Sequence, residues 1–276
     1  MDSLLVVIVL YKCTLFQSKS YNSITKGQID CINCKINFFI YDNTPLLTVN
    51  DSFELGNRVV EYVCDPMNSG LSIAYNKACE FARIHNYDYL LLLDQDTELS
   101  ENFLLHICEC AKLQRNIEIF VPSVYVKELG KYISPGPVRW KRIIPIKNNY
   151  VGEVSLKRIS AINSGLLITV NAFMQCGGYN PHVFLDFSDT TFFERLRKKY
   201  QKMYVIPITI YQNFSGIVKD RELQLSRFSS YCQCARAAGK NGIWNCVQYF
   251  VLICVRSILL SFRFKSFSFI NVMLKK

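Results

Sequence analysis

The fold of this chain is decided by one stretch of sequence, Leu90-Leu91-Leu92-Leu93-Asp94-Gln95-Asp96. An unbroken apolar run of strand length is typical of a strand in a parallel sheet, because helices cover both of its faces. Two carboxylates follow the run directly, and in an extended chain residues i and i+2 point to the same side. The stretch therefore predicts a buried strand that delivers Asp94 and Asp96 to one edge of a sheet.

Segments of strand length and segments of helical period alternate on both sides of this stretch. We expect strands at residues 4–10, 36–41, 58–64, 89–93 and 117–121, and helices at 18–29, 72–85 and 101–114. This alternation predicts an α/β fold, with a Rossmann-like, mostly parallel central sheet and helices on both faces. Ligands of such sheets bind beyond the carboxyl ends of the strands, where this sequence places Tyr11, Asp42 and the acidic pair.

The second half of the chain has a less regular pattern. Residues 131–150 contain three prolines and many basic residues, so we expect a loop or a flexible flap there. Further expected elements are a strand at 159–170 interrupted at Asn163-Ser164-Gly165, a short helix ending near Gly177-Gly178, and a helix at 190–200. The sequence has no internal repeat and no low-complexity tract.

Basic residues are concentrated at the C-terminal end. The 276 residues carry a formal net charge of +10, and from Leu223 to Lys276 there are eight basic residues and no acidic one. Apolar residues between 243 and 262 recur at intervals of three and four, which predicts an amphipathic helix. We expect this helix to lie on a membrane surface or to pack on its own domain. Nucleic acid is not expected as a partner, because the charge coincides with a hydrophobic helix.

Twelve cysteines are present, but their spacing favours reduced thiols over disulfides or zinc. A chain of this length does not need disulfides to stabilise its core, and no export signal precedes the first expected strand. The CxxC pair of Cys31 and Cys34 lacks the second pair of a zinc ribbon, and the three histidines form no spaced cluster. These features predict a cytoplasmic protein.

Two segments near the expected strand ends could bind a metal ion and a phosphate. The carboxylates of Asp94 and Asp96 suit Mg²⁺ or Mn²⁺, which would bind a diphosphate, although one of them could instead cap the helix that follows. Gly70 permits a tight turn before a helix whose first N–H groups would favour phosphate. The alternative is an ordinary turn in which Ser72 caps that helix.

Asp186 and Asp189 are candidates for a general base. Both lie in the segment Phe184-Leu185-Asp186-Phe187-Ser188-Asp189, among aromatic residues. Burial in such surroundings makes a carboxylate more basic, which suits proton abstraction. Asp189 could equally serve only as the N-cap of the helix that follows.

Taken in order, these segments resemble the family 2 inverting glycosyltransferases, which have the GT-A fold, and most closely their rhamnosyltransferase-like branch of bacterial surface-polysaccharide enzymes. The matching segments are residues 5–11, Tyr41-Asp42-Asn43-Thr44, Asn68-Ser69-Gly70 with Ala74 and Asn76, Leu93-Asp94-Gln95-Asp96-Thr97, Asn163-Ser164-Gly165, Gly177-Gly178-Tyr179, and residues 184–189 with Arg195. The resemblance covers roughly the first 200 residues. It implies a GT-A domain at 1–217, with a nucleotide-binding half at about 1–123 and an acceptor half at about 124–217, and a basic helical extension at 218–276.

The resemblance also implies roles for individual residues. The nucleotide-sugar side would comprise Tyr11 and Asp42 beside the base, Asn68, Gly70 and Asn76 nearby, Gln95, and Asp94 on the ribose or the metal, with Asp96 as the principal metal ligand. The acceptor or sugar side would comprise Asn163, Ser164, Gly165, Asp186 and Arg195. Asp189 lies six residues before Arg195, the spacing at which the family keeps its catalytic base. Asn213 stands where many relatives have a histidine that assists the metal, so the metal site is expected to differ there.

The resemblance implies an inverting transferase that moves a sugar, with rhamnose favoured, from a dTDP- or UDP-linked donor to a hydroxyl of a lipid-linked glycan of O-antigen or capsule type. Mg²⁺ or Mn²⁺ would assist it, and the basic C-terminal segment would hold it at the inner face of a bacterial membrane. A sugar nucleotidyltransferase is an alternative, but it would need a glycine-rich basic loop after the first strand, and residues 11–21 contain no glycine. A non-catalytic basic membrane-binding protein is the other alternative.

Overall fold

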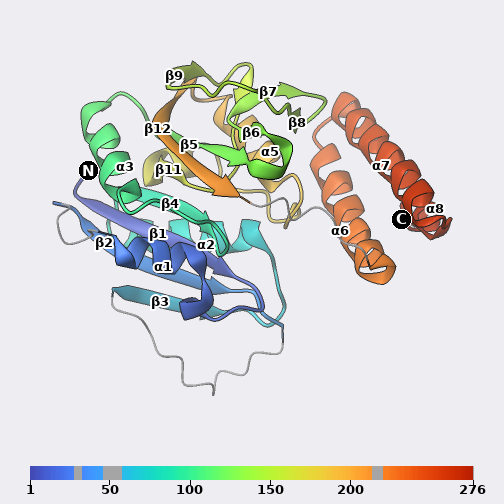
Figure 1. The fold of residues 1–276 in the computed structure, drawn as a ribbon, viewed down its shortest axis with the longest axis horizontal. Coiled ribbons are helices and arrows are strands. Elements are labelled where there is room, and N and C mark those ends of the chain that lie inside the picture. Colours follow the sequence, from blue (N-terminus) through green and yellow to red (C-terminus); the bar gives the residue numbers. More distant parts are fainter. Residues whose placement is uncertain (28–32, 46–57, 213–219, 276) are drawn as a thin grey trace.

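The computed structural model describes residues 1–27, 33–45, 58–212 and 220–275, which form an α/β fold around a central sheet (Figure 1). In this described part, the sheet has nine strands, in the order β3-β2-β1-β4-β11-β5-β12-β9, with β6 paired to β5. The strands are β1 (Ser3–Leu10), β2 (Lys35–Asp42), β3 (Val59–Cys64), β4 (Tyr89–Asp94), β5 (Ile119–Val126), β6 (Lys131–Ser134), β9 (Gly152–Ser155), β11 (Leu166–Thr169) and β12 (Lys202–Gln212).

The first four strands of the sheet run parallel, and this brings their carboxyl ends to one edge. The strand β1 pairs in parallel with β2 and with β4, and β2 pairs in parallel with β3. In this register Leu10 lies opposite Asp42, and Val9 lies opposite Asp94. On the other side of β4, β11 is antiparallel to both of its neighbours, whereas β12 is parallel to β5. The predicted mostly parallel α/β fold is confirmed.

Helices cover both faces of the sheet, and each face has its own core. The helices α1 (Lys19–Lys26) and α3 (Phe103–Leu113) pack on one face, and α2 (Leu71–Ile84), α4 (Val170–Gln175) and α5 (Ser188–Leu196) pack on the other. Alternate residues of β1 enter the two cores, so that Leu4 and Val6 lie in one and Leu5 and Val7 in the other. Burial of each such side chain contributes about 1.5–3 kcal/mol, which explains why these strands are apolar throughout.

Residues 131–150 do not form the expected loop or flap. They contain β6, β7 (Gly136–Arg139) and β8 (Arg142–Ile143), and a small second sheet has the order β10-β7-β8, where β10 is Ile159–Ser160. The prediction was wrong because these short strands are stabilised by pairing with other elements, β6 with the preceding β5 and β7 with β10 further along the chain, and this pairing leaves no local periodicity in the sequence. The strand β12 gave no clear sequence signal for the same reason.

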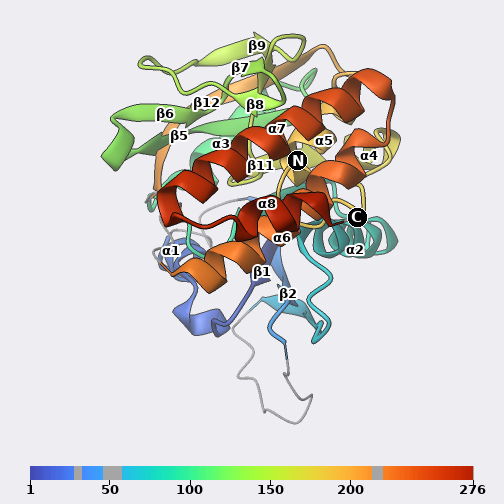
Figure 2. The ribbon, with the colours of Figure 1, turned by 90° about the vertical axis from the view of Figure 1, so that its right-hand side faces the viewer.

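The C-terminal helices form a separate layer at one side of the molecule (Figure 2). They are α6 (Arg221–Gly239), α7 (Ile243–Phe264) and α8 (Ser268–Leu274). Phe228, Tyr249, Ile253 and Phe269 from these helices share a core with Val183, which anchors the layer to the rest of the chain. The predicted amphipathic helix is present as α7, while the division of the chain into domains at residue 217 stays a prediction.

Candidate active site

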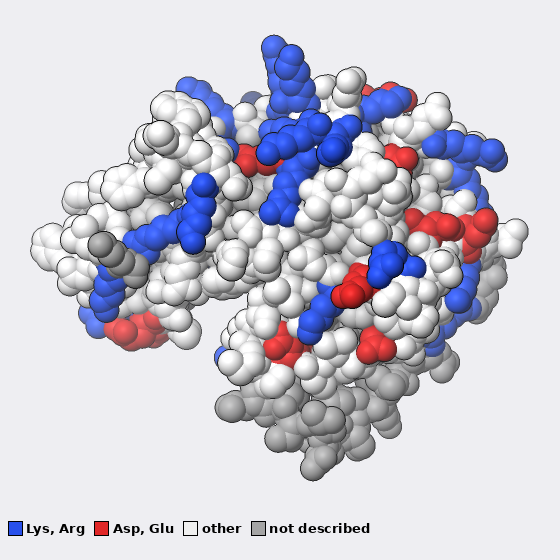
Figure 3. Space-filling model, turned by 180° about the vertical axis from the view of Figure 1, so that it is seen from behind, with Lys and Arg blue, Asp and Glu red and all other residues white. Residues whose placement is uncertain are grey.

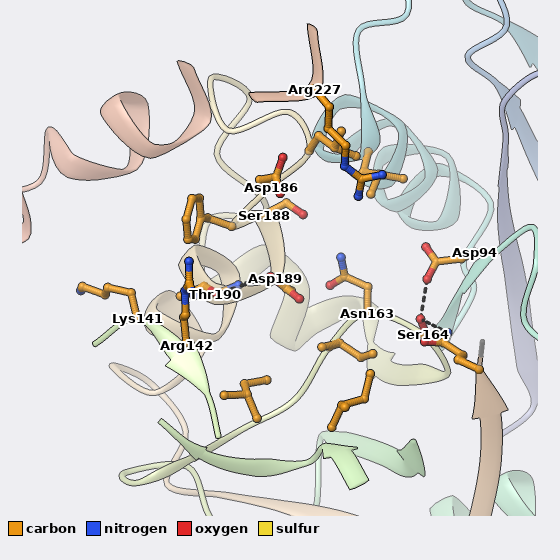
Figure 4. Close-up of a pocket in the computed structure, with 17 residues that line it drawn as sticks. Asp94, Lys141, Arg142, Asn163, Ser164, Asp186, Ser188, Asp189, Thr190 and Arg227 are labelled. Carbon is orange, nitrogen blue, oxygen red and sulfur yellow. Dashed lines mark hydrogen bonds between the residues drawn. The ribbon is translucent and has the colours of Figure 1, made fainter. Parts of the chain in front are cut away.

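A cavity of about 500 Å³ lies beyond the carboxyl end of β4 (Figure 4). Pockets of this size hold small-molecule ligands. The polar side chains that line it are Asp94, Lys141, Arg142, Asn163, Ser164, Asp186, Ser188, Asp189, Thr190, Gln212 and Arg227. Figure 4 shows Asp189 between two sides of this space, with Asp94 and Ser164 on one side and Lys141 and Arg142 on the other. The carboxylate that ends β4 and the candidate base at the start of α5 therefore share one cavity.

Asp94 lies half-buried at the end of β4, and Ser164 orients its carboxylate. The Ser164 hydroxyl donates to Asp94 Oδ2 and accepts from Gln212 Nε2 at 2.9 Å. Burial raises the pKa of Asp94, the Ser164 hydrogen bond opposes the rise, and the charge of Asp96 adds to it. Asp96 itself is exposed. Two carboxylates thus repel each other here, and a bound cation would relieve that repulsion.

The donor set at this position fits a divalent ion that takes further ligands from its substrate. Among the described residues, no group of three or more His, Cys, Asp or Glu side chains is placed to hold a metal. Mg²⁺ is commonly bound by one or two carboxylates, with water and substrate phosphates completing its shell. Asp94 and Asp96 meet that requirement. Asn213, the residue expected in place of a metal-assisting histidine, lies outside the described residues.

Asp189 is the second residue of α5, and its carboxylate points into the cavity (Figure 4). The N-cap of α5 is Phe187, with a left-handed φ of 66°, so the alternative that Asp189 is only an N-cap is wrong. Burial raises the pKa of Asp189 to about 6. The Thr190 N–H donates to Asp189 Oδ1 at 2.7 Å and opposes this rise. The negative charge of Asp94 raises the pKa further. Asp189 is therefore a usable base at neutral pH.

Asp186 also lines the cavity, but cations surround it. Burial raises its pKa, and the charges of Arg256 and Arg227 oppose the rise. Arg256 Nη1 lies 3.9 Å from Asp186 Oδ1. An acid that faces two guanidinium groups is a weaker proton acceptor than one without them, so the geometry favours Asp189 over Asp186 as the base.

The segment before α5 packs on the start of α2 and binds its first N–H group. Gly70 adopts φ +92°, and the Phe184 carbonyl lies so close that a Cβ at Gly70 would come within 2.4 Å of its oxygen. The Leu71 N–H donates to this oxygen at 2.8 Å, and the Ser72 hydroxyl donates to the Val183 carbonyl at 2.5 Å. The segment before α5 thus takes the first N–H of α2, while the expected phosphate site at this helix stays a prediction. The alternative with Ser72 as the N-cap is wrong, because the N-cap of α2 is Gly70.

Two predicted ligand-binding residues instead hold a backbone turn. Asn76 Nδ2 donates to the Tyr179 carbonyl at 3.0 Å, and its Oδ1 accepts from the Tyr179 N–H at 2.8 Å. Arg195 Nη1 donates to the carbonyls of Gly177 and Gly178, both at 2.8 Å. Neither Asn76 nor Arg195 lines the cavity. They are positioning residues for the turn that precedes α5.

Tyr179, within that turn, orients Asn163. Its hydroxyl donates to Asn163 Oδ1 at 2.6 Å, and its ring stacks on Phe192 with centroids 4.0 Å apart. The amide nitrogen of Asn163 is then directed to the cavity side (Figure 4). Gly165, two residues later, has φ +82°, and a Cβ there would lie 2.6 Å from Pro122 Cγ. Gly165 is thus required by the backbone, whereas Asn163 and Ser164 reach the cavity.

The remaining predicted residues do not line the cavity and lie at or after the ends of β1, β2, β3 and β4. Gln95 uses its amide to bind the backbone of Tyr11, accepting from its N–H at 2.7 Å and donating to its carbonyl at 3.2 Å. Tyr11 has an exposed ring. Asp42 is buried, and it accepts from the Tyr62 hydroxyl and from the Thr44 N–H. Asn68 is exposed, with φ 52°. Tyr11 and Asn68 can still contact a ligand, but Gln95 and Asp42 act on the protein itself.

Several residues of the cavity were not anticipated from the sequence. Lys141 comes from the β7–β8 turn, Arg142 from the start of β8, Arg227 from α6 and Gln212 from the end of β12. Tyr75 of α2 does not line the cavity but is fully buried, and burial together with the charges of Asp94 and Asp189 raises its pKa. The basic residues within 131–150 were the one available signal, since basic residues in a segment beside an acidic site suggest contact with a charged ligand.

Comparison with known proteins identifies the fold. No protein-family model matches the chain, and no curated protein is similar to it in sequence. Among solved structures, Staphylococcus aureus TarS 1–349 matches with a TM-score of 0.56 at 10% identity, covering 92% of this chain and 70% of that one. GalNAc-T7 with UDP, GalNAc and Mn²⁺ matches with a TM-score of 0.58 at 13% identity, covering 86% of this chain and 48% of that one. The chain has the GT-A fold.

A third match is TarS 1–349 in complex with UDP-GlcNAc, with a TM-score of 0.57 at 10% identity over 96% of this chain and 73% of that one. The cavity lies beyond the carboxyl ends of the parallel strands, which is where sheets of this kind bind their ligands. The likeness is one of fold, and the role of each side chain rests on its own geometry.

We expect Arg195→Gln to lower stability while leaving ligand binding intact. The change removes a charged donor from two backbone carbonyls, which costs about 1–3 kcal/mol. Urea unfolding monitored by circular dichroism measures the loss, and calorimetric titration with a nucleoside diphosphate measures binding by the folded variant. Unchanged stability combined with lost nucleotide binding would place Arg195 on the ligand instead.

Proposed function

We propose that this chain is an inverting glycosyltransferase that moves a sugar from a nucleoside diphosphate donor to an acceptor hydroxyl. The observation that carries the proposal is the cavity that Asp94 and Asp189 share. Asp94 on one wall, with the exposed Asp96 two residues further on, and a separate base of pKa about 6 on the other wall suit a displacement at an anomeric carbon. The GT-A fold supports it, as do the UDP complexes of the solved neighbours.

On the donor side, Asp94 and Asp96 would hold a divalent ion, which as a Lewis acid supplies charge neutralisation to the diphosphate. Mn²⁺ in the GalNAc-T7 structure supports this choice of group. Ser164 keeps the Asp94 carboxylate in one orientation through its hydrogen bond. Gln212 fixes Ser164 in turn. The chain thus presents carboxylate oxygens that are already oriented before the donor arrives.

On the acceptor side, Asp189 would accept the proton of the incoming hydroxyl. As the hydroxyl oxygen forms its bond to the anomeric carbon, the bond from that carbon to the diphosphate oxygen breaks, and its electron pair leaves with the nucleoside diphosphate. The base and the leaving group stand on opposite faces of the sugar, so the configuration at the anomeric carbon inverts. Help of this kind from a general base contributes about 10² to 10⁴ in rate.

The finer assignment is to family 2 and its rhamnosyltransferase-like branch, with a lipid-linked glycan as acceptor, at the inner face of a bacterial membrane. The motif resemblance supports it. The cations Lys141, Arg142 and Arg227 on the cavity wall also suit an acceptor that carries phosphate. Because the neighbours were solved with UDP ligands, UDP-sugars stand beside dTDP-rhamnose as the first donors to test.

Nucleoside diphosphates are expected to stabilise the protein only when Mn²⁺ or Mg²⁺ is present. With UDP or dTDP present, adding the ion should raise the thermal unfolding temperature of the wild type, since a ligand stabilises the state that it binds. Adding a chelator should return the unfolding temperature to its original value. Asp96→Asn should lose the metal-dependent part of the shift. Equal shifts with and without metal, or no shift with any nucleotide, would favour a protein without this activity.

Asp189→Asn should lower kcat by about 10² to 10⁴ while donor affinity is retained, because the amide cannot accept the proton. Donor hydrolysis or transfer measures kcat, and the metal-dependent thermal shift measures donor binding. Asp186→Asn is the matched control, since it changes a neighbouring acid in the same cavity. A wild-type rate for Asp189→Asn would remove Asp189 from the role of base.

The rate should depend on pH through Asp189. Below a pKa of about 6 the carboxyl is protonated and cannot accept a proton, so kcat/KM should fall about tenfold per pH unit there and level off above it. Initial rates between pH 4.5 and 8 measure this profile, with stability checked at each pH. A flat acidic limb in the wild type would show that no group with this pKa controls the reaction.

A further inference from the structure

The outer face of α7 and α8 is apolar and exposed. The large apolar residues there are more than one-third exposed, namely Ile243, Trp244, Val247, Phe250, Val251, Val255, Ile258, Leu259 and Phe262 on α7, with Phe267 and Leu274 at the two ends of α8. Phe262 is 79% exposed and Phe267 80% exposed. We call these residues the outer face. A patch of this extent on one helix pair marks an interaction surface.

The opposite side of α7 is packed on protein. Tyr249, Leu252 and Ile253 of α7 are buried in the core that α7 shares with α6 and α8. By length and composition, α7 is the one helix in the described part of the chain that could cross a membrane. Of the apolar 18-residue stretch that meets this criterion, 28% is buried inside the protein. Figure 2 shows it running across the side of the molecule, alongside α6 and α8. If α7 crossed a membrane, it would lose its packing against α6 and α8.

Two polar contacts also tie α7 to the rest of the chain. Lys141 Nζ donates to Asn245 Oδ1 of α7 at 2.7 Å and lies 2.6 Å from Glu194 Oε1 of α5. Arg256 of α7 faces Asp186 at the cavity. Moving α7 into the bilayer core would break both contacts and bury unpaired charges, which is costly. The outer face of α7 is therefore open to a partner while the opposite side of the helix stays packed on the protein.

The charge around the outer face is basic. Lys240, Arg263, Lys265 and Lys275 are exposed near the ends of α7 and α8, and from Leu223 to the end of the chain there is no acidic residue. Figure 3 shows the lobe of the C-terminal helices with basic side chains among uncharged ones and one acidic group at its lower end. Apolar side chains flanked by Lys and Arg suit a surface of anionic lipid, where both attractions act together.

Aromatic residues add to the same surface. Trp244 of the outer face lies beside Trp140 from the β7–β8 turn, with ring centroids 6.4 Å apart, and both are exposed. Tryptophan favours the boundary between headgroups and acyl chains. A hollow of about 380 Å³ between α7 and α8 is lined by Ile258, Phe262, Phe267 and Ile270, with Lys265 at its side. Its size and lining suit an acyl chain with an anionic headgroup at Lys265.

We propose that the outer face docks this protein onto an anionic bilayer, with α7 lying in the headgroup boundary and not crossing the membrane. Trp140 and Trp244 enter the boundary, and the basic residues contact anionic headgroups. Because Lys141 and Asp186 line the cavity and each contacts α7, docking sets the cavity at a fixed position above the lipid surface. This docking stands independently of the proposed transferase activity, since it needs neither donor nor metal.

The two tryptophans make the test direct, because they are the only two in the chain and both lie at this surface. The full-length protein is mixed with vesicles of phosphatidylcholine, with or without phosphatidylglycerol, and its intrinsic fluorescence and cosedimentation are followed. Vesicles with phosphatidylglycerol should shift the emission to the blue and sediment the protein, and high salt should weaken both effects. Lipids brominated near the headgroup should quench more strongly than lipids brominated at the chain end.

Two matched substitutions locate the contact. Leu259→Glu changes the outer face, where Leu259 is 63% exposed, and Leu113→Glu makes the same change at the end of α3, where Leu113 is 79% exposed. Leu259→Glu should weaken vesicle binding by at least about tenfold, because it removes a leucine that docking would bury in lipid and adds a negative charge against anionic lipid. Leu113→Glu should bind as the wild type does. Far-ultraviolet circular dichroism checks that both variants fold.

Three results would overturn the proposal. The first is no binding to vesicles with phosphatidylglycerol, or equal binding by Leu259→Glu and the wild type. The second is self-association through the outer face, seen as a dimer in sedimentation that Leu259→Glu abolishes, without vesicle binding. The third is resistance of membrane-bound protein to extraction by alkaline carbonate, which indicates that α7 crosses. Nucleotide binding is measured separately, in solution without lipid. Failure of docking can therefore be distinguished from failure of the proposed function.

Discussion

The candidate active site depends on one hydrogen-bonded turn, Gly177-Gly178-Tyr179. Asn76 of α2 and Arg195 of α5 bind the backbone of this turn, and the Tyr179 hydroxyl binds Asn163 beside β4. Gly178 has φ +61°, and a Cβ there would lie 2.6 Å from Asn76 Oδ1, so the close approach requires glycine. Through this turn, two helices and the sheet are held together. The turn therefore fixes where α5 begins and where Asp189 points.

Holding Asp189 there has an electrostatic consequence. Asp94 and Asp189 are both buried enough for their pKa values to rise, and each raises the pKa of nearby groups, Tyr75 among them. Such an arrangement does not stabilise the fold, and clusters of raised carboxyl pKa values are found where acid–base chemistry takes place. A cation beside Asp94 would reduce the electrostatic repulsion between the two carboxylates and give the two acids separate roles. One carboxylate would then face the leaving group and the other the acceptor.

The sheet could be predicted from the sequence, and parts of the site could not. The apolar run before Asp94 and the alternation of segments are local patterns, and they placed β1 to β4 and the helices between them correctly. The functions of Asn76 and Arg195 are not local, because the backbone carbonyls and N–H that they bind come from a turn far along the chain. The same holds at α2, where the Phe184 carbonyl takes the N–H expected to bind phosphate. Lys141 and Arg227 reach the cavity only through strand and helix packing that leaves no motif.

The account is tested most directly by the anomeric configuration of the sugar that the protein releases. An α-linked UDP-sugar is hydrolysed with Mn²⁺, and proton NMR follows the free sugar before mutarotation equilibrates it. The account predicts that the β anomer appears first, because the nucleophile attacks from the side of Asp189, opposite the diphosphate at Asp94. First appearance of the α anomer would mean retention, and the roles assigned to the two acids would then be wrong.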